Sequence, residues 1–444
     1  MAEVTTTNTA PPGTLMFQPE PVTSIDQTGL GILWLQGLTL KTLYYSGVMT
    51  GFAIAEALCL PFSGVTDQIL LELKKEKYVE VRSSQQMGVG EGAFIYAITE
   101  AGVLRAKETI DRCQYVGPTP VTLKEYINAC AKQTRGHFSV TNRVMRQILS
   151  HLVLADKTFQ KIGPAVNSGL PIFLYGPSGN GKTSIARSIG KLVTEQEIFI
   201  PYAIFIEGQV ILVYDSVNHQ RVNSTEQLAS NGPSLASMRR DTRWVRIKRP
   251  FVVVGGELTL DGLDLVFDDT NKYYEAPFQI KANGGILLID DFGRQMVHPR
   301  DLLNRWIVPL ENHIDYLTLH TGKKIEMPFD VMVMFSTNLP PSELVDEAFL
   351  RRLRHKIEIG NPSFDEFREI FKRAAIALGV GYSDDGLAYL LKEWYLKQKR
   401  NLRGSHPSEL CSQIIDISHY LGIQPAMTVD LLDRAAQSFF VNLS

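Results

Sequence analysis

The first hundred residues alternate between helical and β-type apolar spacing in a recognisable order. Apolar residues recur at helical spacing over 29–47, 50–60 and 63–77, and the second run ends at Pro61. We expect Ser63 or Thr66 to cap the third helix. The stretch "YVEVRSSQQMGVGEGAFIYAIT" (78–99) then has two β-rich runs around a glycine-rich turn, which predicts a hairpin, and 100–111 predicts a closing helix. Three helices followed by a hairpin is the order of a winged helix-turn-helix.

Composition marks the borders of this unit. Residues 1–27 are rich in Thr and Pro, so we expect a disordered tail. "YVGPTP" (115–120) has the glycine and prolines of a linker. The predicted domains are therefore a tail (1–27), a winged-helix-like domain (28–116), an α/β domain (117–360) and a helical region (361–444).

The middle of the chain follows an α/β pattern. Up to about Gly360, short apolar runs alternate with helical segments, which favours a parallel sheet covered by helices. From Pro362 onward the pattern is almost wholly helical. No internal repeat is apparent.

A phosphate-binding loop is predicted between an apolar run and a helix. "GPSGNGKT" (176–183) fits G-x-x-x-x-G-K-[S/T], with a strand pattern at 171–175 before it and a helical pattern after it. Glycines let successive backbone N–H groups face an anion, the helix N-terminus adds its dipole, and the lysine reaches the β- and γ-phosphates. The predicted nucleotide-binding residues are Gly176, Pro177, Ser178, Gly179, Asn180, Gly181, Lys182, Thr183 and Ser184.

A second acidic element completes the expected nucleotide site. In "NGGILLIDDFGRQ" the buried strand 286–289 ends at Asp290 and Asp291. We expect Thr183 and Asp290 to hold Mg²⁺, and Asp291 to activate the attacking water. Asp291 is one methylene shorter than glutamate.

Charge and cysteine content limit the function classes. The net charge of −2 creates no general attraction to nucleic acid or to an anionic membrane, so such a partner would need a local patch. In 29–116 basic and acidic residues balance, so DNA binding by the winged unit stays an alternative that is not favoured. The four cysteines are widely spaced and predict neither a zinc site nor disulfides. We expect no signal peptide, no membrane span and a cytoplasmic location.

Residues 120–444 resemble the AAA+ ATPases in the order of their motifs. "GPSGNGKT" resembles Walker A, "ILLIDD" Walker B, "VMVMFSTN" the sensor 1 strand with Asn338, and "DEAFLRRLRHKIEI" the arginine-finger segment. The helical C-terminal region is similar to the family's lid. "YYEAPFQIKANGGILLIDD" and the expected hairpin around Thr321–Lys323 resemble the clade of MoxR-like ATPases, magnesium chelatases and enhancer-binding activators. The G-A-F-T-G-A motif of the activators is absent from the sequence. By the same comparison, "RPFVVVGGELTLDGLDLVF" (249–267) is expected to form an inserted hairpin.

The resemblance implies specific roles and two departures. Arg352, or else Arg351, would be the arginine finger that reaches a neighbouring subunit's nucleotide. Walker B ends in Asp290-Asp291 rather than Asp-Glu. Ser408 stands where the sensor 2 arginine is expected, and Arg403 is the candidate substitute.

The resulting expectation is an ATP-hydrolysing AAA+ ring, most often a hexamer, that uses Mg²⁺ and remodels an unidentified protein client in a chaperone-like manner. Two alternatives stay open. One is a DNA-associated ATPase, a loader or regulator that uses the winged helix. The other is a slowly hydrolysing, nucleotide-controlled scaffold, suggested by Asp291 and Ser408.

Overall fold

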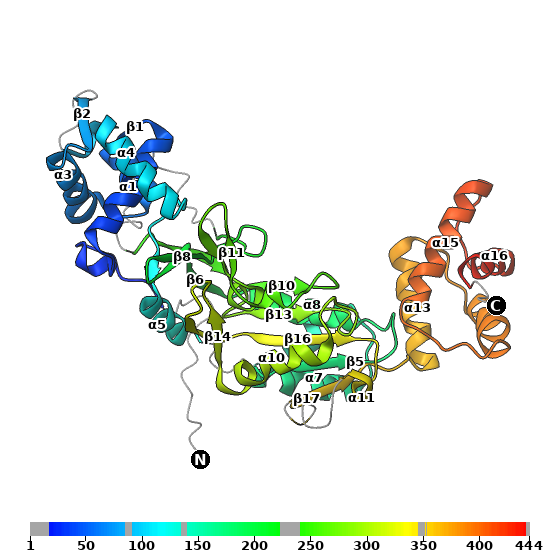
Figure 1. Ribbon diagram of the computed structural model, residues 1–444. Helices are drawn as coiled ribbons and strands as arrows, with labels where there is room; N and C mark the ends of the chain where they lie inside the picture. Colours follow the sequence, from blue (N-terminus) through cyan, green and yellow to red (C-terminus); the bar gives the residue numbers. More distant parts are fainter. Residues whose placement is uncertain are drawn as a thin grey trace, which may run out of the picture.

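The chain forms an elongated molecule with a small module at one end, an α/β core in the middle and a helical bundle at the other end (Figure 1). The computed structural model describes residues 17–84, 91–134, 140–222, 240–344, 351 and 353–440. No single helix among them is long and apolar enough to cross a membrane. The segments Gly51–Leu58 and Phe62–Lys75 reach the necessary length and apolar composition only when they are counted together, and the chain bends by 76° between them.

The N-terminal module packs helices against a small antiparallel sheet of order β1-β3-β2. The predicted hairpin is confirmed, because β2 and β3 pair in antiparallel register. The capping prediction for α3 is wrong: Thr66 has helical backbone angles and its hydroxyl donates to Pro61 O instead. The elements are α1 (Ile32–Ser46), β1 (Val48–Thr50), α2 (Gly51–Leu58), α3 (Asp67–Lys75), β2 (Val79–Ser84), β3 (Phe94–Ile98) and α4 (Glu100–Arg112).

The expected tail and linker are packed where the structure describes them. Phe17 makes an edge contact with Trp244, with ring centroids 6.0 Å apart, and Val22 is buried in the core of the N-terminal module. In the linker, Tyr115 and Thr119 are buried, and the Tyr115 hydroxyl donates to Pro118 O. Disorder up to residue 27 is therefore a wrong prediction for residues 17–27, since apolar side chains there find a core.

The core is a five-stranded parallel sheet of order β10-β13-β16-β5-β17. The chain thus has the predicted α/β fold with a P-loop core. The strands are β5 (Ile172–Tyr175), β10 (Phe251–Val254), β13 (Ile286–Ile289), β16 (Met332–Thr337) and β17 (His355–Glu358).

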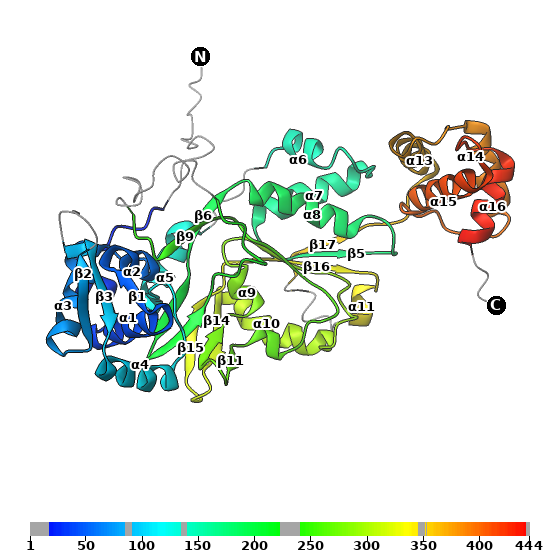
Figure 2. The same cartoon turned by 90° about the horizontal axis from the view of Figure 1, so that it is seen from above.

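Helices cover both faces of this sheet (Figure 2). α6 (Asn142–Ile148), α7 (Asp156–Ser168) and α8 (Lys182–Thr194) lie on one face, and α9 (Phe278–Lys281) and α10 (Pro299–Asn312) on the other. Side chains of a strand alternate between the faces. Accordingly, Ile172 and Leu174 join the cluster under α6–α8, while Phe173 packs in the cluster that contains Trp306 of α10.

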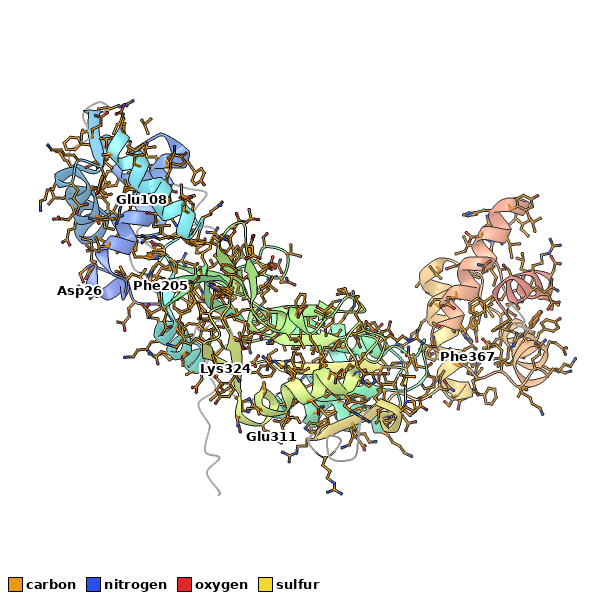
Figure 3. All side chains as sticks on the ribbon, viewed as in Figure 1. Asp26, Glu108, Phe205, Glu311, Lys324 and Phe367 are labelled. Atoms are coloured by element: carbon orange, nitrogen blue, oxygen red, sulfur yellow. The ribbon has the colours of Figure 1, made fainter. Side chains whose placement is uncertain are left out.

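A second sheet of order β11-β12-β8-β7-β4 lies between the core and the N-terminal module. On β7, Phe205 contacts Trp34 of the module, with ring centroids 5.0 Å apart (Figure 3). This region contains β4 (Val121–Thr122), α5 (Leu123–Gln133), β6 (Glu197–Pro201), β7 (Ala203–Ile206), β8 (Gln209–Leu212), β9 (Trp244–Lys248), β11 (Val266–Asp268) and β12 (Tyr273–Glu275), with β6 pairing to β9.

Two hairpin predictions have different outcomes. The inserted hairpin at 249–267 is wrong, because Phe251–Val254 is the edge strand β10 of the parallel core sheet. The hairpin around Thr321–Lys323 is confirmed as β14 (Ile314–Thr318) and β15 (Lys324–Pro328). Its apolar face packs on the second sheet, with Leu317 and Met327 buried.

The C-terminal bundle has a hydrophobic core of its own that includes Phe367 (Figure 3). Capping boxes are local signals that the sequence carries, and Ser363 with Glu366 forms one at the start of α13. The helices of the bundle are α13 (Phe364–Leu378), α14 (Asp384–Leu390), α15 (His406–Leu421) and α16 (Val429–Phe439), with a π-helical segment at Leu391–Leu396. The short α11 (Pro341–Leu344) lies beside the core sheet, where Leu344 joins the core cluster.

Candidate nucleotide site

The glycine-rich loop connects β5 to α8 and has the backbone that its glycines allow. Gly176, Gly179 and Gly181 have φ angles of 135°, 78° and 83°. A Cβ at Gly176 would lie 2.3 Å from Ile359 O, and one at Gly179 would lie 2.6 Å from Ser405 Oγ. Larger residues would therefore push the loop away from the chain after β17 and from residues 361–440, which we call the lid.

Lys182 lies at the centre of the site and is 6% exposed. Its ammonium donates to Gly176 O at 2.8 Å, to Pro177 O at 2.9 Å and to Asn338 Oδ1 at 2.7 Å. Burial, together with the nearby Arg403, lowers the pKa of Lys182, although Asp291 and Asp290 oppose this shift. All three ammonium protons are held by oxygen acceptors of the loop and of Asn338, the residue directly after β16.

The acidic residues after β13 lie against the same loop. Thr183 Oγ1 donates to Asp290 Oδ1 at 2.9 Å. Asn338 Nδ2 donates to Asp291 Oδ1 at 3.3 Å, so Asn338 links Lys182 to Asp291. Asp291 has a φ of 49°, a left-handed conformation that aspartate tolerates better than most residues.

Two bonds fix the relative position of β13 and β16 at this edge. Phe292 N donates to Ser336 O at 2.7 Å, and Thr337 Oγ1 donates to Phe292 O at 2.6 Å. The carboxyl ends of parallel strands meet at one edge of the sheet, where ligands bind. This edge therefore brings together the loop, both aspartates and Asn338.

The lid reaches the loop through three contacts, which we call the lid clasp. Arg403 Nη1 donates to Ser178 Oγ at 2.7 Å, and Gly404 N donates to Asn180 Oδ1 at 3.0 Å. Asn180 Nδ2 donates in turn to Asn361 Oδ1 at 2.9 Å. The arginine expected to replace sensor 2 thus contacts the loop, whereas Ser408 is exposed on the first turn of α15.

Asn361 and Gly404 were missed by sequence reasoning. They follow Asn180 by 181 and 224 residues, so no local spacing connects them to the loop. An asparagine next to Gly360 at the predicted domain border and a glycine shortly before a helical pattern are the weak local signals in the sequence.

The other predicted site residues either lie away from this cluster or fall outside the residues that the structure describes. Ser184 is exposed on the first turn of α8, where its carbonyl accepts from Ser188 Oγ. Arg351 is exposed shortly before β17, and Arg352 lies outside the described residues.

His219 and Asp215 have structural roles. His219 is buried, accepts from Asp215 N and bonds to Lys281 O. Although burial opposes it, hydrogen bonds from Lys281, Val217 N and Asn218 lower the pKa of Asp215 to about 2. Asp215 is therefore the partner of a buried lysine, not part of a metal shell.

The donor chemistry at Thr183 and Asp290 fits a magnesium ion. Their hydroxyl and carboxylate oxygens lie within hydrogen-bond distance of each other, and Mg²⁺ binds oxygen donors, most often one or two protein groups plus phosphates.

Comparison with known proteins shows similarities of limited extent. A family profile described as a domain of unknown function (DUF8689) matches residues 363–438. No curated protein matches the chain. Among solved structures, NtrX from Brucella abortus in complex with ATP is 16% identical over 78% of this chain, with a TM-score of 0.35. Thermotoga maritima RuvB, a Holliday junction branch migration motor, is 15% identical over 64%, with a TM-score of 0.35. The chain spans 65% of that NtrX chain and 70% of the RuvB chain.

Proposed function

We propose that this protein is an AAA+ ATPase that binds ATP at the loop between β5 and α8 and hydrolyses it to ADP and phosphate. The observation that carries the proposal is the convergence of Lys182, Asn338 and Asp291 on one hydrogen-bonded chain beside the Thr183–Asp290 pair. A chance glycine-rich turn gives no reason for these side chains to meet.

Each side chain has a distinct part in the proposed reaction. The Lys182 ammonium leaves its acceptors in the protein for the β- and γ-phosphates, and the loop amides surround the phosphates. Asp291 accepts a proton from the attacking water, and the Asn338 amide orients that water and the γ-phosphate. Thr183 and Asp290 would hold Mg²⁺, which neutralises phosphate charge when bound.

Arg403 is the proposed lid contact to nucleotide. Because it already donates to Ser178, a short movement of its side chain brings the guanidinium to the phosphates. The lid clasp then changes with nucleotide, so that turnover moves the lid against the core.

We further propose that the protein acts as a ring, with six subunits as the leading expectation. Arg352, or alternatively Arg351, would contact the nucleotide of the next subunit and stabilise the transition-state charge in trans. The exposure of Arg351 is compatible with such a role.

The proposed output is remodelling of a protein client, with the N-terminal module as a winged-helix-like docking or regulatory unit. The apolar face of the β14–β15 hairpin is covered by the second sheet, so its exposed tip, 321–324, and its uncovered side are left as client contacts. A slowly hydrolysing scaffold is the second candidate, favoured by the short, left-handed Asp291.

The test is nucleotide binding by a Lys182→Ala variant. We expect its affinity for a fluorescent ATP analogue to fall at least about 100-fold, because a buried charge-assisted contact to phosphate is lost. The matched control is Lys372→Ala on the exposed side of α13, which should bind like the unaltered protein. Unchanged binding by Lys182→Ala would refute the proposed site.

Phosphate release separates the two candidates. Turnover that stops in an Asp291→Asn variant supports the ATPase, whereas tight binding without turnover in the unaltered protein supports the scaffold. The Asp291→Asn variant held in ATP is also the form with which to capture a client.

A further inference from the structure

The helices on one face of the core sheet carry an unusual excess of positive charge. Between residues 123 and 194 the sequence has ten lysines and arginines against two carboxylates, although the whole chain has a net charge of −2. Lys182 belongs to the nucleotide site. Most of the others lie on α6, α7 and α8, which pack side by side over the sheet (Figure 2).

Five of these cations point to solvent in regular stripes, which we call the basic face. Lys157 and Lys161 are four residues apart on α7, and Arg187 and Lys191 are four apart on α8, so each pair lies on one side of its helix. Arg143 is exposed on the neighbouring α6. All five are exposed: Arg143, Lys157, Lys161, Arg187 and Lys191.

The basic face differs from the other helices in its balance of charge. On α3, α4 and α16 the carboxylates are at least as many as the cations, and some pair with them, as in Lys75–Glu72, Arg105–Glu108 and Arg434–Asp430. On α6–α8 the ion pair that the structure shows is Arg146–Asp156. None of the five cations pairs with a carboxylate of the described residues. Solubility alone does not require such a surplus of unpaired cations.

The scarcity of exposed apolar side chains around these cations indicates which class of partner the basic face binds. A protein interface has an apolar centre with aromatic or large aliphatic anchors. Among the exposed large apolar side chains of the described residues, α6–α8 contribute only Val144, which is 39% exposed. A regular phosphate backbone instead needs spaced cations without apolar anchors.

We propose that the basic face binds the phosphate backbone of double-stranded nucleic acid without reading its sequence. This site is distinct from the winged-helix module, where acidic and basic residues balance. It does not depend on the proposed ATPase activity. It would hold duplex against the core while the client-facing surfaces stay free.

The test measures binding of a fluorescein-labelled 30-bp mixed-sequence duplex to the full chain between 50 and 200 mM salt. One variant carries Arg143→Gln, Lys157→Gln, Lys161→Gln, Arg187→Gln and Lys191→Gln. Its matched control removes five exposed charges from the lid: Lys372→Gln, Lys392→Gln, Lys397→Gln, Lys399→Gln and Arg434→Gln. Both variants have the same net charge.

We expect the face variant to bind at least about tenfold more weakly at 100 mM salt, with its log–log salt slope smaller by about 4, while the control stays within about twofold. Lys182→Ala should bind duplex normally, which separates this proposal from the nucleotide site. An equal loss of duplex affinity in the two variants with five substitutions, or no duplex binding by the unaltered chain, would overturn the proposal. So would binding of polyglutamate, but not of duplex, at this face.

Discussion

At the scale of single residues, the site is a chain of amide and carboxylate contacts centred on Asn338. Its Oδ1 accepts from Lys182 and its Nδ2 donates to Asp291, so each end of the amide has the partner that its chemistry requires. Asp291 is the residue of this chain that is least suited to its proposed role. Its side chain is shorter than the glutamate usual in the resembling family, and its backbone is left-handed.

An Asp291→Glu substitution should raise turnover severalfold while lowering stability by about 1 kcal/mol. The longer side chain reaches further toward the γ-phosphate, but glutamate tolerates a positive φ less well than aspartate. Steady-state phosphate release and urea unfolding measure the two effects. Asp301→Glu, at an exposed position of α10, is the control and should alter neither. Turnover that falls below the unaltered level would show that Asp291 does not limit the reaction by its length.

At the scale of elements, the lid core contains a histidine kept neutral by its neighbours. His406 begins α15, is hydrogen-bonded through its Nδ1 to the Tyr395 hydroxyl and packs against Phe439 and Phe440. Burial, then the charges of Arg403 and Arg400, lowers the pKa of His406 to about 4. Protonation is therefore disfavoured in the folded lid.

The lid should lose stability as the pH falls from about 6.5 to 4. In this window the unfolded chain binds a proton at His406 that the folded lid does not, so the free energy of unfolding decreases by about 2 kcal/mol after allowance for partial exposure. Hydrogen exchange of α15 and α16 amides, corrected for intrinsic rates, measures it. A His406→Gln variant, which cannot titrate, should show a flatter profile. The same slope in both proteins would assign the effect to other groups.

At the scale of the whole molecule, Arg243 joins three parts of the chain. It is 1% exposed and pairs with Asp241 at 2.8 Å and with Glu125 at 2.9 Å. Its Nη1 also donates to Thr28 O, at the start of the N-terminal module. Burial opposes the charge, but Asp241 and Glu125 outweigh it and raise the pKa of Arg243. The predicted linker (115–120) is packed here, with Tyr115 and Thr119 buried, so this part of the chain is a joint between the N-terminal module and the second-sheet region.

Replacing Arg243 with methionine should destabilise this joint by about 3–5 kcal/mol, because Asp241 is left buried without a counterion. Urea unfolding followed by hydrogen exchange in α1 and α4 localises the loss. Arg246→Met, which removes the more exposed pair with Glu197, should cost about 1 kcal/mol or less. Equal costs in the two variants would contradict a special role for Arg243.

The sequence by itself determined those parts of the protein that depend on short windows. The loop at 176–183, the apolar strand before it, the helix after it and the two aspartates at the end of 286–289 follow from glycine conformations and residue periodicity over a few positions. The same reasoning identified the hairpins at 78–99 and around Gly322, since turn residues lie between two β-type runs.

Tertiary structure decided what depends on segments far apart in the chain. Phe251–Val254 has a strand pattern, but only its pairing with β13 makes it part of the core sheet instead of a hairpin. Arg403, not Ser408, contacts the loop. The contact joins Arg403 to Ser178, which are 225 residues apart in sequence, so it depends on how the lid packs against the core. On the β14–β15 hairpin, Tyr316 is 43% exposed while the next residue, Leu317, is buried, because only one side of the hairpin is covered. Periodicity shows that a side chain can be buried, whereas the partner that buries it is set by long-range packing.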